Sequence, residues 1–174
     1  MDNFILVGLT GRAGSGKDTV ADWFVKHHKF KKMSFAQPIK VALSALDMPE
    51  PADRERKEQP IPGFSFTWRE AAQKLGTEWG RSLDENLWVK LVQKRLHIAM
   101  SNVVISDVRF ENEAAMIREM GGTILHIQGR QASLGENAIH VSEAGIELHI
   151  EDIVVDNRGS IEELYEQLME LMSE

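Results

Sequence analysis

The chain has 174 residues, of which 20 are Lys or Arg and 27 are Asp or Glu, so its net charge is −7. This length suits one compact domain with a sizeable core, the absence of cysteine excludes Cys-ligated zinc, and the acidic balance argues against nucleic acid as a partner. Because no apolar run is long enough to span a membrane and the amino terminus lacks a secretion signal, we expect a soluble intracellular protein without a membrane partner.

The first elements are an apolar strand over residues 4–9, a glycine-containing loop, and an amphipathic helix that begins near Gly16. A short strand over 32–35 follows, and then a helix with Pro38 in its first turn. Residues 47–66 hold four of the five prolines and a cluster of charges. We therefore expect this segment to be an exposed excursion without regular structure.

Two capping-box patterns mark the middle of the chain. Thr67 with Glu70 and Ser82 with Glu85 both match S/T-x-x-E, in which the two side chains satisfy the free N–H groups at the start of a helix. We expect one helix to begin after Thr67 and another to begin after Ser82.

Strands and helices also alternate in the last part of the chain. The strands expected there are 102–106, 123–127 and 153–155. A helix between the first two ends before Gly121, and Ser160 with Glu163 caps the final helix. The whole pattern predicts a single domain over residues 1–174, with a three-layer α/β/α fold and a mostly parallel five-stranded sheet. Ligands of such folds bind beyond the carboxyl ends of the strands.

The loop after the first strand reads GRAGSGK over residues 11–17 and fits the Walker A pattern G-x-x-x-x-G-K. Glycines let backbone N–H groups point inward as a nest, the following helix adds its positive dipole end, and Lys17 supplies a cation. The alternative is an ordinary glycine-rich turn with an exposed lysine, but the preceding strand and the following helix favour a phosphate-binding loop. The residues expected at the phosphates of ATP are Gly11, Arg12, Ala13, Gly14, Ser15, Gly16, Lys17, Asp18 and Thr19.

Asp18 stands where the motif usually has a Ser or Thr whose hydroxyl binds magnesium. Its carboxylate can bind the ion directly, hold it through water or orient the loop. Asp107 and Arg109 directly follow the strand at 102–106, which is the place of a Walker B acid at the ligand edge of the sheet. A salt bridge within a loop is the alternative for this pair. We expect Mg²⁺ as the cofactor, with Asp18 and Asp107 as its candidate ligands.

Five blocks of the sequence, taken in order, resemble the deoxynucleoside monophosphate kinases of tailed bacteriophages. The similarity extends from residue 4 to about 156, and the blocks are GSGKDTVADWF, SFAQPIK (34–40), REAAQKLGTEWGR (69–81), ISDVRFENE (105–113) and HVSE (140–143). The GKDT loop and the SDVRF block carry most of the resemblance. It implies a P-loop nucleoside monophosphate kinase fold. It also implies transfer of the γ-phosphoryl group of ATP to a deoxynucleoside 5′-monophosphate, which gives ADP and a dNDP with Mg²⁺ present.

Such a kinase needs positive charge between its two phosphate-bearing substrates. By the resemblance, a helical insertion at about 36–100 binds the acceptor. Arg69 and Gln73 share one helix face, and a guanidinium can grip a phosphate in two places, although pairing of Arg69 with a surface acid is the alternative. The expected acceptor-binding residues are Lys40, Arg69, Gln73, Arg81 and Arg109, and the expected catalytic residues are Lys17, Asp107, Arg109 and Arg69.

Residues 128–138 are a candidate for a short lid, in which Arg130 would join the ATP phosphate-binding residues; a merely exposed loop is the alternative. His140 and Glu143 match the family without an evident chemical role, and we expect structural hydrogen bonds from them. A homodimer is compatible with the sequence. The expected location is the cytoplasm, that of the host cell if a phage encodes the protein.

Two other functions stay open on the sequence. The same fold and loop would serve a P-loop kinase for another small acceptor, such as dephospho-coenzyme A or a sugar acid. A nucleotide-binding module without turnover is the second alternative, although the sequence has no Asn-Lys-x-Asp motif for reading guanine.

Overall fold

The structure is a computed structural model that describes residues 4–129 and 146–173. The chain forms two compact units, one from Met1–Ser34 with Arg95–Glu174 and the other from Phe35–Lys94. The second unit occupies nearly the residues where an acceptor-binding insertion was expected. Its role in binding, and the lid expected at about 128–138, stay predictions.

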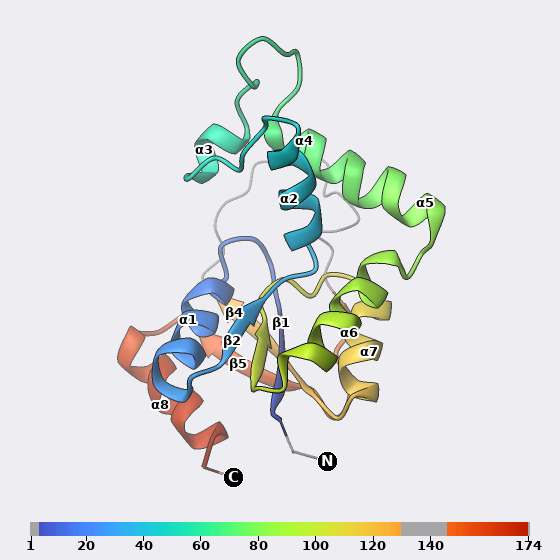
Figure 1. The fold of residues 1–174 in the computed structure, drawn as a ribbon. Helices are drawn as coiled ribbons and strands as arrows, with labels where there is room; N and C mark the ends of the chain where they lie inside the picture. The colour runs from blue at the N-terminus through green and yellow to red at the C-terminus, as the bar shows by residue number, and fades with distance from the viewer. Residues whose placement is uncertain (1–3, 130–145, 174) are drawn as a thin grey trace. The chain divides into compact units, whose positions relative to one another are not determined.

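The first unit is built on a five-stranded sheet in which every strand pairs in parallel with its neighbours (Figure 1). The strand order is β2-β3-β1-β4-β5. The strands are β1 (Leu6–Thr10), β2 (Lys31–Met33), β3 (Val103–Ile105), β4 (Thr123–Gly129) and β5 (Ile153–Asn157). The carboxyl ends of all five strands therefore meet at one edge, and β1 lies at the centre.

One face of the sheet packs against α1 (Lys17–His28) and α8 (Ile161–Leu171). Val7 and Leu9 point into this core from β1, and Phe24 of α1 and Leu164 of α8 are buried against them. The expected cap of α8 is confirmed, because Ser160 Oγ accepts from the Glu163 backbone and the Glu163 carboxylate accepts from the Ser160 backbone. Both ends of the chain thus contribute to the same hydrophobic core.

The opposite face packs against α7 (Glu111–Glu119). A Cβ atom added to Gly8 of β1 would lie 2.7 Å from side-chain carbons of both Ile117 and Ile124. The helix ends as expected before Gly121, which has a φ of 77°. Helices on both faces of a parallel sheet confirm the three-layer α/β/α fold.

The second unit is helical. It contains α2 (Gln37–Ala45), α3 (Arg54–Lys57), α4 (Trp68–Gln73), a π-helix η1 (Lys74–Gly80) and α5 (Arg81–Leu83). The chain returns to the first unit along α6 (Leu87–Ala99). The capping box of Thr67 and Glu70 is confirmed at the start of α4, with N···O distances of 2.7 and 3.1 Å.

Two expectations for this unit were wrong. Ser82 does not cap a helix, because the helical backbone continues through it to Leu83; its hydroxyl donates to the Trp79 carbonyl, and α6 begins only at Leu87. The segment 47–66 is also not wholly irregular. It contains α3, which Asp53 caps by accepting from the Arg56 backbone at 2.7 Å.

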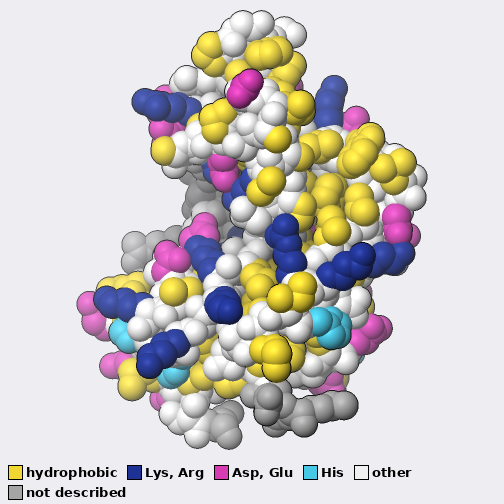
Figure 2. Space-filling model, viewed as in Figure 1, with side chains coloured by type: hydrophobic (Ala, Val, Ile, Leu, Met, Phe, Trp, Pro, Cys, Tyr) yellow, Lys and Arg dark blue, Asp and Glu magenta, His cyan; other side chains and the backbone are white. Residues whose placement is uncertain are grey.

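On the face drawn in Figure 2, Lys and Arg are interspersed with Asp and Glu, and no continuous basic area is visible there. Among the described residues, no helix combines the length and the apolar character needed to cross a membrane.

Candidate active site

The loop between β1 and α1 has the backbone of a phosphate nest. Gly11, Gly14 and Gly16 have φ angles of 140°, 80° and 99°, in the left-handed region that side chains disfavour. A Cβ atom at Gly11 would also lie 2.5 Å from the Ile127 carbonyl oxygen. Gly16 directly precedes α1, so the free N–H groups and the positive end of that helix face the loop. This arrangement suits an anion held by main-chain donors.

Lys17 closes this loop with its side chain. Its ammonium nitrogen donates to the Gly11 carbonyl at 2.7 Å and to the Arg12 carbonyl at 2.8 Å. Ser15 is only 4% exposed, and its hydroxyl has no hydrogen-bond partner within the described part of the chain. A buried hydroxyl without a partner is unfavourable, so a ligand oxygen at this place would stabilise the loop.

Asp18 lies on the exposed side of α1. Its side chain is 85% exposed and pairs with Lys32 of β2 at 2.9 Å, and Asp22 pairs with the same ammonium at 2.9 Å. Partial burial alone would lower the pKa of Lys32, but hydrogen bonds to Asp22 and Asp18 outweigh that effect and raise the pKa. Sequence reasoning did not foresee this pairing. It gives Asp18 a partner that any metal ion would have to replace.

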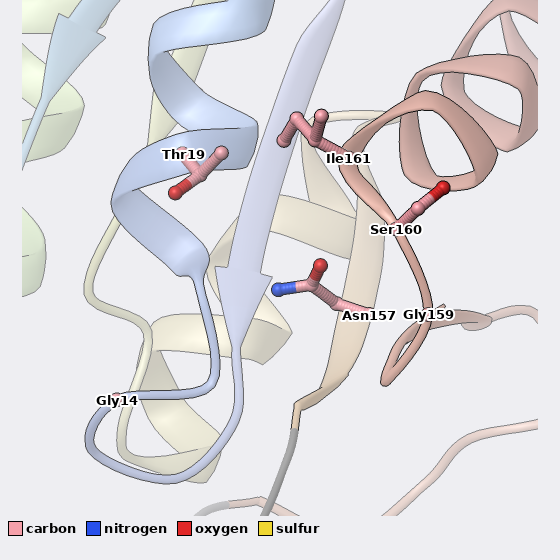
Figure 3. A pocket seen from close by; sticks show the side chains of 6 residues that line it. All are labelled: Gly14, Thr19, Asn157, Gly159, Ser160 and Ile161. Atoms are coloured by element: carbon pink, nitrogen blue, oxygen red, sulfur yellow. The ribbon is translucent and has the colours of Figure 1, made fainter.

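A pocket of about 450 Å³ opens beside the loop, within the size range of small-molecule sites. Gly14 and Thr19 line one side, and the turn between β5 and α8 lines the other with Asn157, Gly159 and Ser160 (Figure 3). The Asn157 amide donates to the Ser15 carbonyl at 2.8 Å, which ties the end of β5 to the phosphate loop.

Sequence reasoning missed Asn157. The signal was available, because Asn157 is a polar residue at the carboxyl end of a strand, followed by Arg-Gly-Ser and a helix. In a parallel α/β sheet, ligands bind beyond the carboxyl ends of the strands. What the sequence does not give is the strand order, which places β4 and β5 next to β1.

Asp107 and Arg109 follow β3 at the same edge of the sheet as the loop. The register pairs Gly8 with Ile105, and the Val108 backbone donates to the Leu9 carbonyl at 3.0 Å. Asp107 therefore lies level with the end of β1. The carboxylate of Glu113, which is 3% exposed, accepts from the backbone N–H groups of Arg109 and Phe110 at 2.8 and 3.2 Å. Glu113 thus fixes the turn that carries Asp107.

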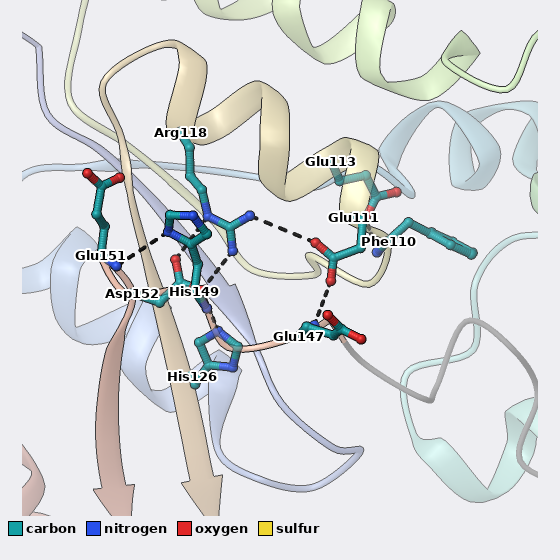
Figure 4. Close-up of polar contacts among 9 residues, drawn as sticks. All are labelled: Phe110, Glu111, Glu113, Arg118, His126, Glu147, His149, Glu151 and Asp152. Atoms are coloured by element: carbon teal, nitrogen blue, oxygen red, sulfur yellow. Dashed lines mark hydrogen bonds and ion pairs between the residues drawn. The ribbon is translucent and has the colours of Figure 1, made fainter.

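A buried carboxylate anchors the other end of β5. The side chain of Asp152 is 1% exposed and accepts two hydrogen bonds from Arg118, at 3.0 and 2.7 Å, and one from the His149 backbone (Figure 4). His126 Nε2 lies 2.8 Å from the same carboxylate; since an ionised carboxylate only accepts, this nitrogen carries the proton. Burial alone would raise the pKa of Asp152, but the hydrogen bonds from Arg118, His149 and His126 lower it to about 2. β5 is thus held by Asp152 where it begins and by Asn157 where it ends.

The second unit contains Lys40, Arg69, Gln73 and Arg81, whereas Arg109 belongs to the first unit. The helices α2 and α4, which carry Lys40 and Arg69, contact each other. Arg69 forms an ion pair with Glu58, and Arg81 donates to the Glu85 carbonyl at 3.4 Å. An acceptor phosphate at Arg69 would therefore compete with a carboxylate of the protein.

Lys40 belongs to a second group of charges in this unit. Glu50 accepts from Lys40 at 3.0 Å and from Lys57 at 2.6 Å. Burial alone would raise the pKa of Glu50, but its hydrogen bonds to Lys57 and Lys40 outweigh that effect and lower the pKa. These contacts join α2 to the segment that carries α3.

Three candidates from the sequence, Arg130, His140 and Glu143, lie outside the described residues. Within those residues, no group of three or more His, Asp or Glu side chains is placed to hold a metal ion. Mg²⁺ does not require such a group, because it is commonly bound by one or two carboxylates together with substrate phosphates and water.

Comparisons with known proteins agree with this geometry. A family model described as deoxynucleotide monophosphate kinase matches residues 53–168. A protein of Acanthamoeba polyphaga mimivirus, provisionally named a deoxynucleotide monophosphate kinase, is 34% identical over 95% of this chain and 94% of its own. The deoxynucleotide monophosphate kinase of Enterobacteria phage T4 is 25% identical over 94% of this chain and 96% of its own. Among solved structures, a sugar kinase from Janibacter sp. HTCC2649 shares the fold, with a TM-score of 0.55 and 18% identity over 98% of this chain and 95% of its own.

Proposed function

The chain belongs to the deoxynucleotide monophosphate kinase family, and from this premise we propose which of its residues bind the two nucleotides. The protein is a kinase that transfers the γ-phosphoryl group of ATP to a deoxynucleoside 5′-monophosphate. The site assignment rests on the loop at residues 11–16, in which three glycines have positive φ angles. The Lys17 side chain closes this loop, and α1 begins directly after it.

The loop amides and Lys17 bind the β- and γ-phosphates of ATP. To reach them, the Lys17 ammonium exchanges its two carbonyl partners, at Gly11 and Arg12, for phosphate oxygens. The hydroxyl of Ser15 gains a partner in the same step. The nucleoside part of ATP extends from the loop past Thr19 and lies in the pocket beside Asn157, because these two residues line the same cavity. Arg130 closes over the phosphates.

Asp107 is the residue best placed to hold Mg²⁺, directly or through a water molecule. It follows β3 at the level of the loop, and the backbone around it is fixed by Glu113. Asp18 assists only after it releases Lys32. When bound, the ion neutralises charge on the phosphates of ATP.

The acceptor nucleotide binds the second unit. In that unit, Arg69 and Arg81 bind its phosphate, Gln73 contacts its base, and Lys40 lines the site. Arg109, a residue of the first unit, stabilises the negative charge on the transferred phosphoryl group. An oxygen of the acceptor phosphate attacks the γ-phosphorus, the bond to the β,γ-bridging oxygen breaks, and ADP leaves with that electron pair. No side chain needs to act as a nucleophile. Catalysis consists of positioning and of stabilising the negative charge.

The test is an assay of ADP release. The panel of acceptors is dAMP, dGMP, dCMP, dTMP and their ribose counterparts, with dephospho-coenzyme A and gluconate as controls. We expect turnover with one or more deoxynucleoside monophosphates and none with the two controls. Turnover only with a control, or with no acceptor at all, would contradict the proposed function.

A further inference from the structure

The helix that carries the proposed acceptor residues changes its winding halfway. α4 ends at Gln73, the π-helix η1 runs from Lys74 to Gly80, and Arg81 follows at once. A π-helix of seven residues is uncommon, and such segments concentrate at functional sites. No sequence pattern predicted it here.

The change of winding alters which residues share a helix face. Arg81 is twelve positions after Arg69, and an unbroken α-helix turning 100° per residue would leave the two side chains about 120° apart. A π-helix turns only about 80° per residue because its hydrogen bonds reach one residue further. Over the seven residues Lys74–Gly80 this removes roughly 140°, so Arg81 returns to within about 20° of Arg69. Gln73, four positions from Arg69, lies about 40° away on the same side.

A buried side chain packs against two glycines of the π-helix. The indole N–H of Trp88 in α6, which is 7% exposed, donates to the Gly76 carbonyl at 2.6 Å. In an α-helix that carbonyl would accept from the N–H of Gly80, so a donor from outside favours the wider hydrogen-bond ladder. The ring also lies where a Gly80 side chain would be: a Cβ atom there would be 2.3 Å from Trp88 Cζ2. Glycine at position 80 is therefore required by this packing.

We propose that the π-helix, held by Trp88, places Arg81 on the same helix face as Arg69 and Gln73, which makes Trp88 a positioning residue of the acceptor site. The inference rests on the proposed function, in which these three side chains bind the acceptor nucleotide. Trp88 itself is buried against Gly76 and Gly80. It acts by setting the rotation of the helix after residue 74.

Changes of helix length test this directly. Deletion of Glu78, an exposed residue of the π-helix, lets the segment wind as an α-helix, with Arg81 eleven positions after Arg69 and about 20° away. Insertion of one alanine between Glu78 and Trp79 is the matched control, since it rotates Arg81 by about 80–100° whichever winding the helix adopts. We expect the deletion to leave the acceptor KM within about 3-fold of the parent, and the insertion to raise it about 30-fold, as Arg81→Ala does. The donor KM should stay within about 2-fold in both.

Trp88→Phe keeps an aromatic ring but removes the N–H donor. It should raise the acceptor KM about 10-fold at an unchanged donor KM, and deletion of Glu78 in the same variant should restore the acceptor KM. If deletion and insertion raised the acceptor KM equally, or if Trp88→Phe left it unchanged, the positioning role would be refuted. If Arg81→Ala itself left the acceptor KM unchanged, the assignment of Arg81 would fail, and the inference with it. If Arg81→Ala raised the acceptor KM but the insertion did not, the positioning role of the π-helix would be refuted, while the assignment of Arg81 to the acceptor site would stand.

Discussion

Replacement of Asp152 by asparagine should destabilise the protein in a manner that depends on pH. The pKa of this carboxyl is about 2 in the folded chain, against about 3.9 for an aspartate in an unfolded chain. Because the folded-state pKa is the lower one, the ionised group adds stability above pH 4, and this contribution is lost as the pH falls from about 4 to 2. The difference of roughly two pKa units corresponds to about 2.5 kcal/mol at pH 7 and to about half of that at pH 3.

The measurement is the melting temperature of parent and variant at both pH values. For a chain of this length, about 2.5 kcal/mol corresponds to a loss of roughly 5–10 °C at pH 7, and about half of that is expected at pH 3. Asp156→Asn is the matched control. Hydrogen bonds from Arg158 lower the pKa of Asp156 to about 2 as well, but this side chain is 45% exposed, and solvent screens the pair.

We therefore expect little change of melting temperature in Asp156→Asn at either pH. Equal losses in the two variants would refute the reasoning, because burial would then make no difference. A loss in Asp152→Asn that is the same at pH 3 and pH 7 would refute the electrostatic origin of the effect.

Three further predictions concern the proposed site. Lys17→Ala should lower kcat by about 10²–10³-fold while the melting temperature is kept, because one cation at the transferred phosphoryl group is lost; a near-normal kcat would contradict the phosphate-loop assignment. Arg69→Ala should raise the acceptor KM about 30-fold and leave the donor KM nearly unchanged in steady-state kinetics, whereas equal effects on both would place Arg69 elsewhere. Asn157→Asp puts a carboxylate beside the Ser15 carbonyl and the phosphate loop, so the donor KM should rise about 10-fold at an unchanged acceptor KM; an unchanged donor KM would remove Asn157 from the donor site.

Much of the first unit was predictable because local patterns determine it. The apolar run at 4–9, the glycines at 11, 14 and 16, and the capping box of Ser160 each act within a few residues, and the structure has the expected strand, loop and helix. The parallel sheet followed from the alternation of strands and helices. Its order did not, since nothing in the local sequence states which strands become neighbours.

The parts that sequence reasoning missed depend on distant contacts. The π-helix at residues 74–80 depends on Trp88, which is distant in the sequence. The capping pattern at Ser82 was misleading because Ser82 already lies inside a helical segment. The pairing of Asp18 with Lys32 requires α1 and β2 to lie side by side. Whether the proposed acceptor residues act together stays a prediction that the kinetic variants test.

The central position of β1 in the sheet has a consequence for folding during translation. β1 is made first, yet its partners β3 and β4 emerge only about 100 residues later, after the whole second unit has been translated. Leu164 and Leu168, which complete the core around β1, are translated later than all five strands. The nascent polypeptide therefore carries β1 unpaired until β3 and β4 have emerged, and the first unit completes its core only after α8 has been made.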